Sequence, residues 1–74
     1  MVARTLVFET THHALWAEEV AREMRLGVEV VPAPAAARAG CDLAIEALDE
    51  DLAALLDGLR ERGIAFRVFE RPDG

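Results

Sequence analysis

A single cysteine and two adjacent histidines are the residues of this chain best suited to chemistry. Cys41 is the only cysteine among 74 residues, so no disulfide can form within the chain. A thiolate is a nucleophile, and it can carry a group as a persulfide or mixed disulfide. Without a second cysteine, Cys41 is better suited to carrying such a group than to thioredoxin-like exchange. The alternative is a small buried side chain without a chemical role, since free cysteine is among the most buried residue types.

The histidines His12 and His13 do not form a metal site by themselves. Adjacent helical residues point about 100° apart, so the two imidazoles cannot bind one ion together. A site made of Cys41 and His12 lacks ligands within one chain, because a closed zinc site needs about four. We therefore expect no metal and no other cofactor. Metal binding by these residues across a dimer is one alternative, and capping or packing in a first helical turn is another.

The composition excludes several classes of partner. The chain has 14 acidic residues against eight basic ones, all arginine, which gives a net charge of −6. No basic stripe with interleaved aromatic residues is present, which argues against nucleic acid, and an acidic surface argues against anionic membranes. No apolar run approaches the roughly 20 residues of a membrane helix, and the first residues lack the pattern of a signal peptide. We expect a cytoplasmic protein with one domain over residues 1–74 and a frayed tail at 71–74.

The hydrophobic pattern predicts two β-α-β halves. The expected strands lie at 6–8, 28–31, 43–47 and 64–68, and the expected helices run over 11–25 and from 49 to about 62. Expected helix boundaries are Thr10 or Thr11 and Gly27 for the first helix, and Asp49 and Gly63 for the second. The first helix should bury Ala14, Ala17, Ala21 and Met24, flanked by Val20 and Trp16, with Leu15 exposed; the second should bury Leu52, Leu55, Leu56 and Leu59.

Two intercalated halves of this kind give an α+β ferredoxin-like βαββαβ sandwich, with sheet order 4-1-3-2 and both helices on one face. Its two central strands, the first and the third, are adjacent and antiparallel, so the third begins beside the end of the first. Cys41 is therefore expected beside Thr10, Thr11 and the N-terminus of the first helix, with His12 and His13 close by. A helix N-terminus and a protonated imidazole both favour a thiolate.

The second face of the sheet has no helix and must meet water or a partner. Val31, Ala44 and Phe69 are expected there, together with Val7. Such a face suits a homodimer. The alternative is a few scattered apolar residues without a partner.

Several strings in the chain resemble one known family. They are Phe8 to Glu18, Gly27 to Val30, Pro32-Ala33-Pro34, and a cysteine opening the third strand. Together they resemble the DUF3343 family of small bacterial proteins, described as "putative Se/S carrier protein-like", over nearly the whole chain. The resemblance implies that Cys41 is the family's cysteine and that Thr11-His12 is its strand-to-helix turn.

The chain departs from the family's pattern around the cysteine. Ala35-Ala36 follows Pro34 where members tend to have Pro-Arg-Glu after the loop, and Asp42 follows Cys41 where they tend to have glycine. Arg38 is the candidate substitute for the missing arginine. Late in the third strand, Glu46-Ala47 stands in place of the usual Arg-Phe.

The function expected from residues and resemblance is that of a sulfur or selenium carrier in the cytosol. Cys41 would take a persulfide sulfur from a donor protein and pass it to an acceptor, without turnover of its own. The supporting residues would be Thr10, Thr11, His12, His13 and Arg38. The alternative is a non-catalytic ferredoxin-like module with an inert cysteine, which binds a protein or a small ligand through the open sheet face or the loop at 32–40.

Overall fold

The computed structural model describes residues 3–35 and 42–69. Cys41, Arg38 and the expected tail at 71–74 lie outside the described residues. The elements are β1 (Ala3–Val7), α1 (Thr11–Glu23), β2 (Val28–Pro32), β3 (Leu43–Leu48), α2 (Asp49–Glu61) and β4 (Arg67–Phe69). Neither helix in the described part of the chain has the length and apolar character needed to cross a membrane.

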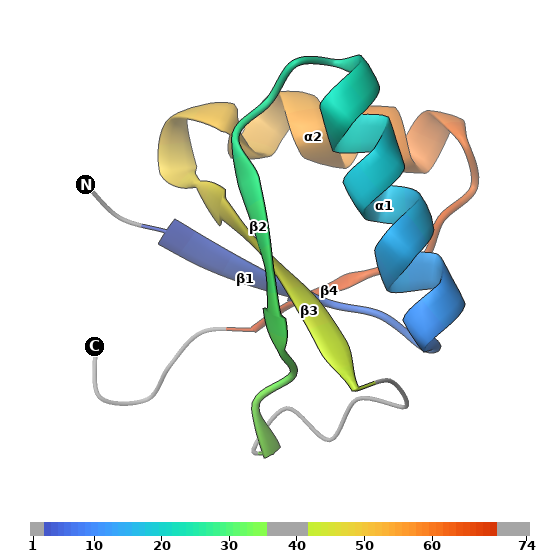
Figure 1. Cartoon of the computed structure of the whole chain (residues 1–74). Helices are drawn as coiled ribbons and strands as arrows, with labels where there is room; N and C mark the ends of the chain where they lie inside the picture. Colours follow the sequence, from blue (N-terminus) through green and yellow to red (C-terminus); the bar gives the residue numbers. More distant parts are fainter. Residues whose placement is uncertain (1–2, 36–41, 70–74) are drawn as a thin grey trace.

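The four strands form one antiparallel sheet in the order β2-β3-β1-β4, and both helices cover the same face (Figure 1). Read from the other edge, this is the predicted order 4-1-3-2. The prediction of an α+β ferredoxin-like βαββαβ fold is therefore confirmed. β4 is shorter than predicted, because regular pairing with β1 begins at Arg67.

The core lies between the sheet and the two helices. Leu6 of β1 and Ile45 of β3 are paired in register and fully buried, and Leu55 and Leu59 of α2 pack over them. Each fully buried aliphatic side chain of this kind contributes about 1.5–3 kcal/mol. The buried face of α1 consists of Ala14, Ala17, Val20 and Ala21. Small residues along this face let the helix backbone lie close to its neighbours.

A glycine in α2 leaves room for a side chain of α1's C-cap between the two helices. A Cβ atom added to Gly58 would lie 2.6 Å from Sδ of Met24 and 3.5 Å from Cγ1 of Val20. The missing side chain of Gly58 thus leaves the space that Met24 fills at the end of α1. This explains a glycine in the middle of a helix, where it costs roughly 0.5–1 kcal/mol relative to alanine.

The end of α2 follows the prediction. Gly63 has a φ of 73°, in the left-handed region, and its N–H donates to the carbonyl of Arg60 at 3.0 Å. The N–H of Ile64 donates to the carbonyl of Leu59 at 2.9 Å. These two bonds form a Schellman motif, in which glycine is the favoured left-handed residue.

The predicted end of α1 at Gly27 is wrong. The helix ends at Glu23 with Met24 as its C-cap, and Arg25 takes the left-handed conformation with a φ of 61°. The N–H of Arg25 donates to the carbonyl of Arg22 at 3.1 Å. The N–H of Leu26 donates to the carbonyl of Ala21 at 2.9 Å. This is the same Schellman pattern with an arginine in the position of the glycine. The helix stops where Leu26 can pack against the core rather than at the nearest glycine.

The predicted helix starts have mixed outcomes. Thr10 is the N-cap of α1, as expected, and its side chain accepts the N–H of His13. Asp49 is not the cap of α2: that position belongs to Leu48, which makes no side-chain capping bond. Asp49 is instead the first helical residue, and its carboxylate meets Nε of Arg4 at 3.3 Å.

The helix-free face of the sheet carries the predicted apolar residues. Val7 and Ala44 are 1% and 0% exposed, and Val31, Ala33 and Phe69 pack against them. The two central residues of this face are thus already buried within one chain. The homodimer through this face stays a prediction.

The two glycines near the helix ends are expected to respond differently to alanine. Gly63→Ala should lower the free energy of unfolding by about 1–2 kcal/mol, because a Cβ is disfavoured in the left-handed region. Gly27→Ala should leave it unchanged or raise it by up to about 1 kcal/mol, because the site lacks a positive φ and an added Cβ meets nothing within 4 Å. Urea denaturation followed by circular dichroism measures both. Equal losses in the two variants would contradict the assignment of the left-handed residue.

Candidate functional site

The start of β3 meets the first turn of α1. The antiparallel pairing of β1 with β3 brings the end of β1 beside the beginning of β3. Asp42, which directly follows Cys41 in the chain, donates its backbone N–H to Oγ1 of Thr11 at 3.3 Å. Its carbonyl accepts the N–H of Ala33 at 2.9 Å. The prediction that the third strand begins beside the N-terminus of the first helix is therefore confirmed at Asp42.

Thr10 links the cap of α1 to the ring of His13. Oγ1 of Thr10 accepts the backbone N–H of His13 at 3.1 Å and lies 2.7 Å from Nδ1 of the same residue. A hydroxyl that accepts an N–H can still donate its own hydrogen to the ring nitrogen of a neutral imidazole. His13 therefore takes part in the cap, which agrees with the capping alternative considered from the sequence.

The two helix N-termini differ in charge. The first turn of α2 contains Asp49, Glu50 and Asp51, whereas that of α1 contains no acidic residue. Acidic side chains in the first turn compensate the partial positive charge of a helix N-terminus. The start of α1 lacks this compensation, so it is the better of the two for an approaching anion.

His12 lies away from this cap, on the outer face of α1. Together with Leu15, Trp16 and Glu19 it lines an open hollow of about 480 Å³. Leu15 is 46% exposed, as predicted, but Trp16 is 39% exposed, so its predicted place beside the core is wrong. The alanine face holds α1 close to its neighbours, and a large side chain at its margin extends outward.

The sequence contained a signal for this outer face. The positions 12, 15, 16 and 19 follow the i, i+3, i+4, i+7 spacing of one helix face. Trp16 is expected from the sequence beside the buried alanines of α1. The sequence therefore did not predict that Leu15 and Trp16 form an exposed apolar pair on this face.

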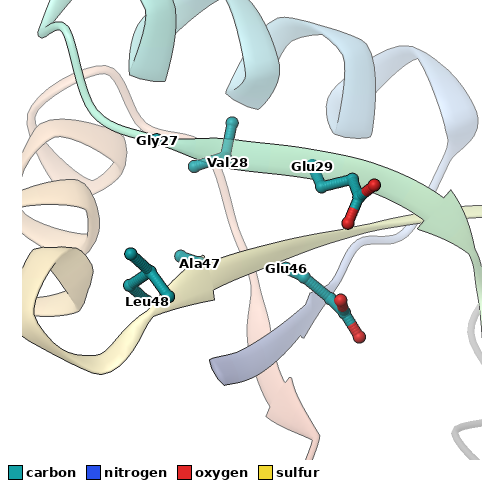
Figure 2. A pocket seen from close by; sticks show the side chains of 6 residues that line it. All are labelled: Gly27, Val28, Glu29, Glu46, Ala47 and Leu48. Carbon is teal, nitrogen blue, oxygen red and sulfur yellow. The ribbon is translucent and has the colours of Figure 1, made fainter. Parts of the chain in front are cut away.

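A second, smaller hollow lies where β2 pairs with β3 (Figure 2). Glu29 and Glu46 are direct partners across the two strands. Like charges in that position destabilise a sheet. No group of three or more side chains that could hold a metal ion is found among residues 3–35 and 42–69. The hollow also lies toward the opposite end of β3 from Asp42.

Comparison with known families gives a match over most of the chain. The model of the family described as "Putative Se/S carrier protein-like" matches residues 4–70. The match covers both helices and all four strands, apart from the first residue of β1. No curated protein and no solved structure matches the chain.

Two threonine variants are expected to separate the cap of α1 from its link to β3. Thr10→Val should lower the free energy of unfolding by about 1 kcal/mol, because α1 loses its capping acceptor. Thr11→Val removes the acceptor of the Asp42 N–H, so its main effect should be faster hydrogen exchange at that amide. Amide exchange followed by NMR, relative to the amides within α1, measures this. Equal acceleration at Asp42 in both variants would contradict the link through Thr11.

Proposed function

We propose, from the premise that this chain belongs to the Se/S carrier-like family, that it carries a sulfur or selenium atom on Cys41 between partner proteins. The family match over residues 4–70 is the observation that carries the proposal. Cys41 is the candidate because it is the only cysteine in the chain. The proposed setting is the cytosol, where thiols remain reduced.

Loading and release are two exchanges at one sulfur atom. In loading, the Cys41 thiolate attacks the outer sulfur of a donor persulfide. A new S–S bond to Cys41 forms while the S–S bond of the donor breaks, and the donor cysteine leaves as a thiolate. In release, an acceptor thiolate attacks the same outer sulfur, and Cys41 leaves as the thiolate. Neither step needs an external oxidant or reductant, and the carrier has no turnover of its own.

The surroundings of Asp42 support this role. Asp42 is tied to Thr11 at the start of α1, and Cys41 is its covalent neighbour. An uncompensated helix N-terminus stabilises a thiolate or a persulfide anion in its vicinity. We assign this stabilisation to the turn formed by Thr10 and Thr11. The carboxylate of Asp42 opposes it, because a neighbouring negative charge disfavours a thiolate.

Three further residues belong to the proposal with different roles. His13 acts through the Thr10 cap, since its ring lies 2.7 Å from the Thr10 hydroxyl. His12 and Arg38 would supply positive charge to the bound anion. For His12 this requires its side chain to turn from the outer face of α1, where it lines the hollow with Trp16.

The direct test is transfer from a sulfur donor. The reduced chain is incubated with a cysteine desulfurase and cysteine, and intact mass is measured. We expect an increase of one sulfur atom in the native chain and none in Cys41→Ala. No increase in the mass of the native chain, or an equal increase in the native chain and in Cys41→Ala, would contradict the proposal.

The pH dependence of thiol labelling tests whether Cys41 is activated. Labelling of the folded chain should be fast and half-maximal below about pH 8.5, the ordinary pKa of a free thiol, because a helix N-terminus favours the thiolate. Asp42→Asn should move the midpoint lower, since it removes the opposing negative charge. Labelling that occurs only after denaturation would instead support the binding module with an inert cysteine.

A further inference from the structure

We propose that the outer face of α1 is a self-association surface, on which the α1 helices of two copies pack antiparallel about a two-fold axis. The surface consists of His12, Leu15, Trp16 and Glu19, and is called the α1 outer face below. The inference does not rest on the carrier function, because it uses neither Cys41 nor the turn formed by Thr10 and Thr11. His12 is the one residue that both proposals use.

The α1 outer face exposes an apolar pair that the fold does not use. Leu15 and Trp16 are 46% and 39% exposed, and they are two of the three large apolar side chains exposed in residues 3–35 and 42–69. They adjoin the open hollow on the side of α1 opposite the buried alanines. Tryptophan is enriched at the centres of interfaces, and the neighbouring leucine adds apolar area around it.

The order of residues along this face makes it complementary to itself. His12 stands at one end and Glu19 at the other, about 10.5 Å apart along the helix axis, with the apolar pair between them. A two-fold axis that passes between Leu15 and Trp16 places His12 opposite Glu19 of the second copy. It also places Leu15 opposite Trp16 of that copy. Each of these contacts occurs twice, as in any isologous interface.

The carboxylate of Glu19 is available for such a pair. Glu18 and Glu23, on the same helix, are paired with Arg22 at 3.2 Å and with Arg62 at 3.5 Å. Glu19 makes no ion pair in the described part of the chain. The available charges at the two ends of the apolar pair are therefore an imidazole and an unpaired carboxylate, which attract each other when the imidazole is protonated.

The helix-free sheet face is the weaker candidate for self-association. Its central residues, Val7 and Ala44, are already buried within one chain. The α1 outer face is small, however, because stable complexes bury about 800 Å² on each partner and a single helix face offers less. The net charge of −6 also opposes the approach of two copies. The dimer we infer is thus weak and depends on concentration.

Sedimentation equilibrium on the reduced chain at a pH near 6 tests the proposal. Reductant excludes disulfide dimers through Cys41. We expect a monomer–dimer equilibrium that shifts toward monomer as the protein is diluted from about 1 mM to about 10 μM. Trp16 is the only tryptophan, so its emission should move to longer wavelength upon dilution as it becomes exposed to water.

Variants that exchange the charges of His12 and Glu19 test whether these two residues pair across the dimer. His12→Glu and Glu19→Lys should each raise the dimer dissociation constant by about 10-fold, because each change removes two cross-copy pairs. The double variant restores opposite charges and should return the constant to within about 3-fold of the native value. His12→Glu also places an acid in the first turn of α1, which favours the helix, so the fold is not at risk.

Glu61→Lys is the matched control. It makes the same change in net charge as Glu19→Lys but lies at the end of α2, so it should leave the dimer unchanged or tighter. Cys41→Ala should dimerise as the native chain does, whatever its result with a sulfur donor. A chain that is monomeric at about 1 mM overturns the proposal. A dimer dissociation constant that neither His12→Glu nor Glu19→Lys changes also overturns the proposal. So does a double variant whose dissociation constant does not return toward the native value.

Discussion

The antiparallel pairing of β1 with β3 determines the position of most other elements in this small domain. Leu6 stands opposite Ile45 in this register, and both side chains point to the side that the helices cover. Their neighbours Val7 and Ala44 point to the other side and form the second apolar cluster. A shift of one residue in either strand would exchange the two faces and expose the core. The same pairing sets the start of α1 beside Asp42, so the core and the candidate site depend on one set of backbone bonds.

The fold could be predicted because local and global signals agree along most of the chain. Alternating apolar residues mark β3, and alanines and leucines mark one face of each helix. Thr10 is one of the two threonines expected to cap α1, and Gly63 was assigned correctly. Each combines a favoured residue type with the position that the packing requires. Gly27 was not, because the end of α1 is determined by the packing of Leu26 against the core. Arg25 therefore adopts a backbone conformation that its residue type does not favour.

The placement of Asp42 beside the start of α1 could be predicted from topology but not from side-chain patterns. The neighbourhood of Asp42 and Thr11 follows from strand order alone, without knowledge of any side chain. The exposure of Trp16 depends on how close the alanines bring α1 to the other elements, which periodicity does not indicate. The opposition of Glu29 and Glu46 depends on the register of β2 against β3. Such a register is a property of two distant segments, so neither segment reveals it by itself.

The contact between Met24 and Gly58 gives this domain a chemical sensitivity of its own. The thioether sulfur occupies space that even a methyl group on residue 58 would contest. Oxidation of a methionine adds an oxygen to the sulfur and turns an apolar side chain into a polar one. At Met24 the added oxygen would place a polar group against the contact with Gly58 and Val20. Oxidation of this one side chain would therefore weaken the packing of α1 against α2 without any change in the sequence.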